Sequence, residues 1–321
     1  MATRVSIIQT RNEKRTATPG QEHAPPLARV FSATFLAFLA IVFLLGVNFV
    51  AVRFSNHELP PFWGAGLRFA VASLILLGIV RLRHLAMPTG AALVGAAVFG
   101  VLVFGAAYGF LYWALLYVSS GMAAVLFATV PLITLLLAVS VGLEQFRWRS
   151  AIGAVLALVG LGVVFREQLR ADVPLISLLA VLLGALCAAL SGIIIKRFPK
   201  SHPISTNAVA MAVGTLILLT TSRIIGEVWQ VPALPATWAA LGWLIISAIV
   251  AFVLMIWVLS RWSASATSYT SVLQPLVTVV VARWLVGEHV TLAFLIGGAL
   301  ALAGAYLGAL AGQTRRPLAE R

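Results

Sequence analysis

The sequence predicts an all-α integral membrane protein of ten transmembrane helices, arranged as two inverted five-helix repeats. Three observations lead to this prediction: an apolar composition, ten apolar runs, and a match of the chain to itself at a fixed offset. Of the 321 residues, 61% are hydrophobic and 10% are charged, and the mean hydropathy is +1.05. Because soluble chains carry about 25% charged residues, this composition excludes an ordinary soluble domain and indicates a chain that resides in a bilayer.

The apolar runs are bounded by charged residues, proline or glycine, and short links join most of them. Each run is long enough for a helix to cross ~30 Å of hydrocarbon. We expect helices because lipid-exposed backbone must satisfy its own hydrogen bonds, and because the alternating polarity of a barrel is absent. The expected spans are 31–53, 61–80, 90–117, 119–143, 149–166, 173–196, 204–223, 237–259, 264–286 and 290–311.

The net charge of +13 would suggest a nucleic-acid partner in a soluble protein, but the cations alternate between successive links. With the N-terminus inside, the inner segments carry 16 Lys and Arg residues and the outer segments 5, while Arg68 lies within a span. The positive-inside rule therefore predicts a multi-pass protein of a bacterial inner membrane, with both termini cytoplasmic and no nucleic-acid partner. Residues 1–30 are expected to form a disordered cytoplasmic tail, and residues 312–321 a second tail.

An internal repeat appears when the chain is compared with itself at an offset of 144 residues. Aligned pairs are Pro131 with Pro275, Glu144 with Glu288, Gly153 with Gly297 and Gly160 with Gly304. We therefore expect one repeat at 31–166 and a second at 173–311. Because each copy holds an odd number of helices, the second must enter the membrane from the opposite side. Inverted repeats can expose a central site to either side in turn, which favours a carrier over a membrane enzyme.

Three stretches of the sequence resemble a known family. LLGVNFVAVRF, PPFWGAGLRFAVASLILL and SSGMAAVLFATVPLITLLLAVSVGLE are similar to the EamA-type branch of the drug/metabolite transporter superfamily, over nearly the whole chain. Within that family, the chain most resembles aromatic amino acid exporters. The resemblance implies the drug/metabolite transporter fold, a central cavity lined by spans 1, 3, 4, 6, 8 and 9, and export of amino acids or other metabolites.

Polar and aromatic residues within the spans are the candidates for substrate binding. They are Asn48, Tyr108, Tyr112, Phe127, Ser191, Trp257, Tyr269, Ser271 and Gln274. Tyr108 and Tyr112 share one helix face with Phe104, and such a face suits an aromatic or apolar ligand. The alternative is helix packing, which is also the common role of polar residues such as Asn48 and Ser191 in membrane helices.

Two prolines are predicted to act as hinges. Pro131 and Pro275 lie near the middle of spans 4 and 9, where proline kinks a helix and frees the carbonyl four residues earlier. The freed carbonyls belong to Phe127 and Ser271, and together with Gln274 they would accept a substrate ammonium. The alternative is a pair of ordinary kinks whose freed groups are satisfied by neighbouring helices.

The charged residues limit the mechanism. Arg68 is predicted to be a structural clamp first and a ligand of a substrate carboxylate second. None of the nine acids or five histidines lies mid-span, so we expect facilitated transport without proton coupling. The sequence contains no phosphate-binding loop, metal-ligand cluster or catalytic triad, so we expect no cofactor, no metal and no enzymatic activity.

The leading hypothesis is a secondary transporter that exports amino acids, aromatic or otherwise neutral, by alternating access. The alternatives are an efflux carrier for drugs or other small metabolites and, less favoured, a polytopic membrane enzyme acting on lipid-linked substrates. Small-residue faces in spans 5 and 10 favour close packing or a homodimer contact, and otherwise the protein is expected to be a monomer. Their glycines are Gly153, Gly160, Gly162, Gly304, Gly308 and Gly312.

Overall fold

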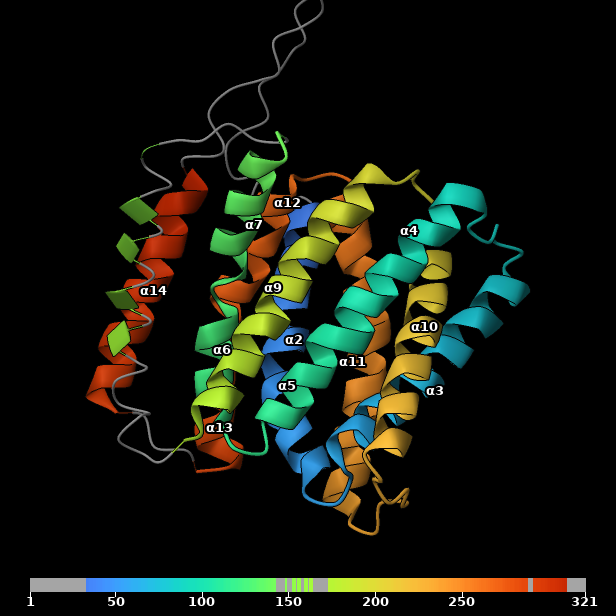
Figure 1. Ribbon diagram of the computed structural model, residues 1–321, viewed down its shortest axis with the longest axis horizontal. Helices are drawn as coiled ribbons and strands as arrows, with labels where there is room; N and C mark the ends of the chain where they lie inside the picture. The colour runs from blue at the N-terminus through green and yellow to red at the C-terminus, as the bar shows by residue number, and fades with distance from the viewer. Residues whose placement is uncertain are drawn as a thin grey trace, which may run out of the picture.

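The computed structural model describes residues 33–142, 173–287 and 291–310, together with residue 148 and four two-residue pieces between 152 and 163. Helices joined by links make up this part of the chain, and it contains no strand (Figure 1). The predicted tails, residues 1–30 and 312–321, and more than half of the predicted span 149–166 lie outside the described residues.

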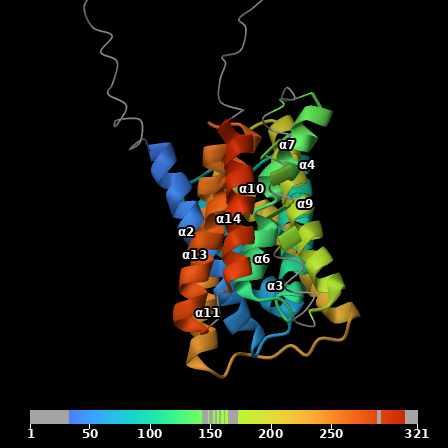
Figure 2. The same cartoon turned by 90° about the vertical axis from the view of Figure 1, so that its left-hand side faces the viewer.

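The helices follow one another along the chain and pack as a bundle of tilted rods (Figure 1). They are α2 (Ala33–Asn56), α3 (Pro61–Leu82), α4 (Gly90–Gly100), the π-helix η1 (Val101–Ala107), α5 (Tyr108–Ala114), α6 (Ser120–Phe127), α7 (Val130–Ser140), α9 (Leu175–Arg197), α10 (Pro203–Ile224), α11 (Pro235–Leu259), α12 (Ala264–Ser268), α13 (Thr270–Leu285) and α14 (Leu292–Leu310). Helix α14 lies at the left edge of the bundle in Figure 1, and in Figure 2 it faces the viewer beside α13.

Seven of these helical spans are long and apolar enough to cross a membrane. Within the described residues they cover 33–56, 61–82, 90–114, 120–140, 175–197, 203–224 and 235–259. Large apolar side chains cover their outer surface, among them Leu74 and Leu216, each 67% exposed, and Ile246 at 61%. A surface of this kind is stable against lipid and unfavourable in water. The prediction of an all-helical membrane protein is therefore confirmed, and the expected count of ten spans stays a prediction.

Helices α3 and α10 pack closely and run in opposite directions. A Cβ added at Gly66, early in α3, would lie 2.5 Å from the Leu219 side chain, which is late in α10. Further along, the Ser73 hydroxyl donates to the backbone carbonyl of Ala208, which is early in α10, at 2.9 Å. Small residues let the two backbones approach, and a buried hydrogen bond sets their register.

The bundle has two ends that differ in charge. We call the end formed by residues 57–60 and 225–234 the glutamate end, and the end formed by 83–89, 198–202 and 260–263 the basic end (Figure 1).

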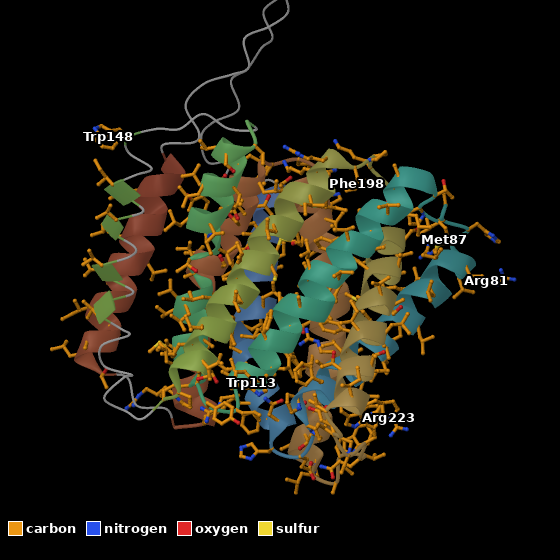
Figure 3. The ribbon with its side chains drawn as sticks, viewed as in Figure 1. Arg81, Met87, Trp113, Trp148, Phe198 and Arg223 are labelled. Atoms are coloured by element: carbon orange, nitrogen blue, oxygen red, sulfur yellow. The ribbon has the colours of Figure 1, made fainter. Side chains whose placement is uncertain are left out.

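Labelled side chains follow the same division. Phe198 lies at the basic end, whereas Trp113 and Arg223 lie toward the glutamate end (Figure 3). The link 198–202 lies against α4, because a Cβ added at Gly95 would lie 2.6 Å from the Phe198 side chain.

Two carboxylates cap helix N-termini at the glutamate end. Glu58, which follows α2, accepts hydrogen bonds from the backbone N–H of Leu234 at 3.0 and 3.2 Å, where α11 begins. Glu227, which follows α10, accepts from the N–H groups of Phe62 at 3.1 Å and Trp63 at 2.7 Å, where α3 begins. Anions stabilise helix N-termini because the first N–H groups have no partner within the helix. The two links therefore hold each other's following helix, and this end of the bundle is closed by reciprocal contacts.

We predict that Glu58 makes the stability of this end depend on pH. Hydrogen bonds from the Thr237 side chain and then from the Leu234 backbone hold the Glu58 pKa below its ordinary value of 4.5. A lowered pKa gives stability that is present above the unfolded pKa and is lost as pH falls through the folded pKa. At pH 7, Glu58→Gln should therefore melt below the wild type in detergent, and the difference should shrink below about pH 4.5. A difference that stays the same at pH 4 would contradict this prediction.

Candidate functional site

A cavity of about 120 Å³ lies inside the bundle. Its walls come from α2, from the span formed by α4, η1 and α5, from α6 and α7, and from α9, α11, α12 and α13. These are the six spans that the family resemblance implied. The volume is below the ~300 Å³ of a drug-sized site, so the cavity suits a small metabolite.

Six of the nine predicted binding residues line this cavity. They are Asn48, Tyr108, Phe127, Ser191, Ser271 and Gln274. The other three lie elsewhere. Tyr112 is fully buried beside Arg68, Tyr269 joins α12 to α13, and the Trp257 ring centroid lies 3.7 Å from the Arg261 guanidinium at the basic end.

Asn48 is held in one orientation by two hydrogen bonds from α11. Its Oδ1 accepts from Trp243 Nε1 at 3.0 Å and from the Ser247 hydroxyl at 2.8 Å. The side chain is 4% exposed, and within the described part of the chain its Nδ2 has no hydrogen-bond partner. Because Oδ1 already accepts two hydrogen bonds, the part of this cavity-lining side chain that remains available is the Nδ2 amino group, which is a donor.

Four hydroxyl groups on α12 and α13 belong to the cavity lining, and we call them the hydroxyl cluster. Each donates to a backbone carbonyl three or four residues earlier: Thr267 to Ser263 at 2.9 Å, Ser268 to Ser265 at 2.7 Å, Thr270 to Thr267 at 3.0 Å and Ser271 to Ser268 at 2.7 Å. A hydroxyl has one proton and two lone pairs. Since the proton is used within the helix, the oxygens remain available as acceptors.

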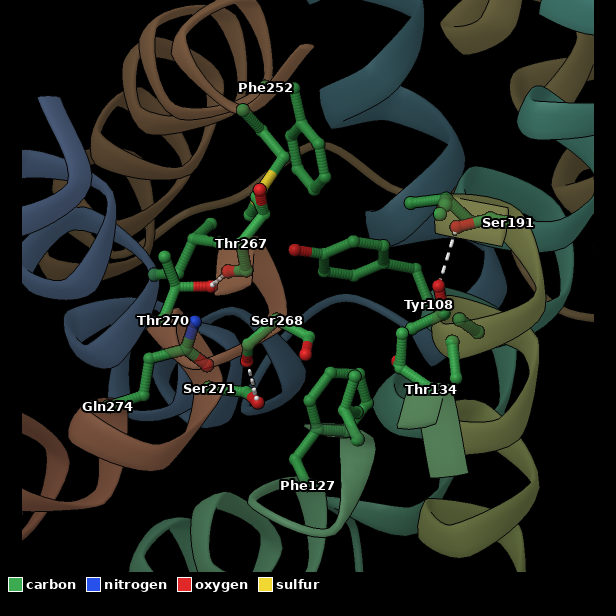
Figure 4. A pocket seen from close by; sticks show the side chains of 18 of the residues that line it. Tyr108, Phe127, Thr134, Ser191, Phe252, Thr267, Ser268, Thr270, Ser271 and Gln274 are labelled. Carbon is green, nitrogen blue, oxygen red and sulfur yellow. Dashed lines mark hydrogen bonds between the residues drawn. The ribbon is translucent and has the colours of Figure 1, made fainter. Parts of the chain in front are cut away.

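Aromatic rings complete the walls. Tyr108 points into the cavity toward Thr267 and Ser268, with Phe252 and Phe127 on either side of it (Figure 4). The Tyr108 and Phe252 rings meet edge to face with centroids 5.8 Å apart. The cavity thus combines apolar and aromatic surface with a few uncharged polar groups, the usual composition of a small-molecule site.

Both predicted hinge regions have interrupted helices beside the cavity. Between α6 and α7 the chain is interrupted at residues 128–129, so Pro131 stands in the first turn of α7. Between α12 and α13 the chain is interrupted at Tyr269, and Pro275 lies inside α13. Broken helices are tolerated at membrane depth where they line a cavity. Whether the prolines act as hinges stays a prediction.

Arg68 is fully buried one side chain behind the cavity wall. Its Nη1 donates to the Tyr112 hydroxyl at 3.1 Å, and the guanidinium carbon lies 4.5 Å from the Phe69 ring centroid and 4.8 Å from that of Tyr108. These cation–π contacts stabilise a desolvated cation. Among the described residues, Nε and Nη2 have no hydrogen-bond partner. The contacts fit the predicted clamp between α3 and α5, and two donors remain unused.

Sequence reasoning missed three features of the cavity. Thr267, Ser268 and Thr270 of the hydroxyl cluster were not predicted, although the run SASATSYTS at 263–271 is unusually polar for a membrane span. Phe252 gave no signal, because it is one of four aromatic residues in a largely apolar helix. The π-helical stretch Val101–Ala107, which places Val103 and Ala107 in the wall, also has no distinctive sequence.

Comparison with known proteins gives one family match. The profile described as the EamA-like transporter family matches residues 32–166 and, a second time, residues 175–309. One solved crystal structure superposes with a TM-score of 0.65 over 88% of this chain and 99% of the other, at 18% identity. That likeness indicates a shared fold.

Relatives of similar length include membrane proteins from several bacteria. The uncharacterized transporter YoaV of Bacillus subtilis is 24% identical over 85% of this chain and 95% of its own. The uncharacterized inner membrane transporter YedA of Escherichia coli strain K12 is 28% identical, covering 79% and 83%. A Salmonella typhimurium protein named "Probable amino-acid metabolite efflux pump" is 25% identical, covering 88% and 96%.

Proposed function

Because this chain belongs to the EamA-like transporter family, we propose that it is a secondary transporter that exports amino acids and related metabolites across the inner membrane. Family and relatives indicate a transporter rather than an enzyme. The observation that carries the proposed substrate is the cavity, where uncharged donors and acceptors lie beside aromatic rings. The relative named for amino-acid metabolite efflux points the same way.

The proposed architecture is ten spans in two inverted five-helix repeats. The double match of the family profile supports the duplication. The opposite directions of α3 and α10, which are repeat partners, support the inversion, because duplicated helices with the same orientation would run the same way.

The proposed mechanism is alternating access, with interrupted helices beside Pro131 and Pro275 as hinges. The lining of the cavity reaches Leu259 and Ala264, where α11 ends and α12 begins next to the basic end. At the glutamate end, the links hold each other through Glu58 and Glu227. The positive-inside rule makes the basic end cytoplasmic, so this arrangement corresponds to an inward-facing state, and both termini are proposed to be cytoplasmic.

Transport is proposed to be uncoupled from protons. Within the described residues, the two acidic side chains, Glu58 and Glu227, lie at the glutamate end and cap helices. Proton-coupled carriers usually place a titratable group within the membrane.

Drug efflux is the second candidate, which the largely apolar cavity wall favours. A homodimer through spans 5 and 10 is the proposed alternative to a monomer.

Transport by the purified protein in liposomes tests the proposal. Liposomes loaded with unlabelled phenylalanine are expected to accumulate labelled phenylalanine by counterflow, at the same rate with and without an imposed pH gradient. Protein-free liposomes and liposomes loaded with ethidium serve as controls. Counterflow with ethidium alone would favour the drug carrier, and accumulation that requires and consumes the pH gradient would refute uncoupled transport.

A further inference from the structure

We propose that Asn48, Tyr108 and Arg68 form a carboxylate subsite, so that the cavity selects substrates with a free α-carboxylate next to an ammonium. This inference rests on the proposed function and adds to it the recognised chemical group and the orientation of the substrate. It predicts that amides and decarboxylated amines are poor substrates, even when their side chains are identical to those of good ones.

The first part of the subsite is the amide of Asn48. Trp243 and Ser247 both donate to its oxygen, and this fixes which end of the amide is left over. The remaining Nδ2 is buried, has no acceptor among the described residues, and belongs to a residue of the cavity wall. A buried donor without a partner is costly, and a substrate oxygen removes that cost.

The second part is the hydroxyl of Tyr108, which extends into the cavity (Figure 4). Asn48, Arg68 and Tyr112 are the side chains that act on this hydroxyl. The phenol can therefore donate to the same anionic group as Asn48 Nδ2. Two convergent donors match the two oxygens of a carboxylate.

The charge comes from Arg68, which acts through Tyr108 as a positioning residue. Arg68 is fully buried, and no carboxylate among the described residues neutralises it, because Glu58 and Glu227 both cap helices at the glutamate end. Interactions of a buried charge are weakly screened. The field of Arg68 at the hydroxyl end of Tyr108 therefore favours an anion, and a neutral amide gains much less from it.

The hydroxyl cluster supplies the complementary half of the site. Thr267, Ser268, Thr270 and Ser271 direct their protons to helix carbonyls, so their oxygens accept hydrogen bonds. Tyr108 points toward two of them (Figure 4). Donors for a carboxylate thus lie next to acceptors for an ammonium. The two charges of an α-amino acid are separated by only a few bonds and need this adjacency.

Competition in proteoliposomes tests the subsite. Unlabelled phenylalanine, phenylalaninamide or phenethylamine is added as a competitor to the exchange of labelled phenylalanine. In the wild type, phenylalanine should compete at least about tenfold more strongly than either analogue, a ratio equal to about 1.4 kcal/mol. Tyr108→Phe and Arg68→Met should reduce that ratio toward one, mainly by weakening competition by phenylalanine. Tyr108→Phe keeps the aromatic ring and removes only the hydroxyl, so this variant tests the subsite even if Arg68→Met fails to fold.

Arg223→Met is the matched control. Arg223 also stacks on an aromatic ring, 4.4 Å from the Trp229 centroid, but it lies toward the glutamate end (Figure 3) and is not one of the residues that line the cavity. In Arg223→Met, the ratio of competition by phenylalanine to competition by its analogues should equal that of the wild type. An unchanged ratio in folded Tyr108→Phe, or a wild type that exchanges phenylalanine and its amide equally, would overturn the subsite alone. A wild type that exchanges none of the three compounds would overturn the proposed function, and the subsite with it.

Discussion

A Gly214→Ala variant is expected to melt well below the wild type and to lose transport activity. A Cβ at position 214 of α10 would lie 2.2 Å from Phe104 Cβ and 2.9 and 3.0 Å from two Phe104 backbone atoms. Because backbone cannot rotate away as a side chain can, η1 must move. Overpacking of this kind costs roughly 1–3 kcal/mol, occasionally more.

The damage should extend to transport, because Phe104 supports the cavity wall. Its ring centroid lies 4.7 Å from that of Phe252 and 6.4 Å from that of Tyr108. The measurements are the melting temperature in detergent and the exchange rate per folded protein in liposomes. Both should fall.

Gly242→Ala in α11 is the matched control, since nothing lies within 4 Å of the added Cβ. Alanine is the better helix former by about 0.5–1 kcal/mol, so this variant should be as stable as the wild type or slightly more so. Equal melting temperatures for the two alanine variants would show that η1 and α10 do not meet as described.

An Asn48→Leu variant is expected to be both destabilised and inactive. Leucine removes the acceptor shared by Trp243 Nε1 and the Ser247 hydroxyl. Ser247 keeps the Leu244 carbonyl as an acceptor at 3.2 Å, but the Trp243 donor loses its partner, which costs about 1–3 kcal/mol for a buried group, and the cavity also loses a donor. We expect exchange of phenylalanine to fall at least about tenfold, equivalent to about 1.4 kcal/mol, together with a lower melting temperature.

Asn48→Asp separates the two roles of this side chain. Aspartate keeps an oxygen for Trp243 and Ser247, so the contact between α2 and α11 should persist and the variant should fold better than Asn48→Leu. It replaces the donor by an anion, which repels a substrate carboxylate, so exchange of phenylalanine should still fall. Wild-type exchange by a folded Asn48→Asp variant would show that Nδ2 has no part in binding.

The candidate site was only partly predictable from residue types. Asn48, Tyr108, Ser191 and Gln274 were identified because polar or aromatic side chains within a span are unusual, and all four line the cavity. Tyr112 has the same residue type and helix face as Tyr108, but its hydroxyl accepts from Arg68 outside the cavity. One helical turn separates them, and sequence spacing cannot say which turn faces the cavity and which faces a neighbouring helix.

The proline prediction shows the same limit. The sequence indicated weak points in spans 4 and 9, and both contain interruptions. Their positions differ, however, because the interruption lies two to three residues before Pro131 and six residues before Pro275. Proline frees the carbonyl four residues earlier, but packing selects the residue at which the helix breaks, and before Pro275 that residue lies more than one turn away.

Composition and the length of apolar runs were sufficient to predict membrane helices, because hydrocarbon leaves the backbone no partner except itself. The duplication was also predictable from the sequence, because residues repeat along the chain at a fixed offset of 144. The cavity, the orientation of the Asn48 amide and the burial of Arg68 depend on how helices distant in sequence meet. Those contacts involve the crossing of α2 with α11 and of α3 with α10, which side-chain packing decides and no local pattern encodes.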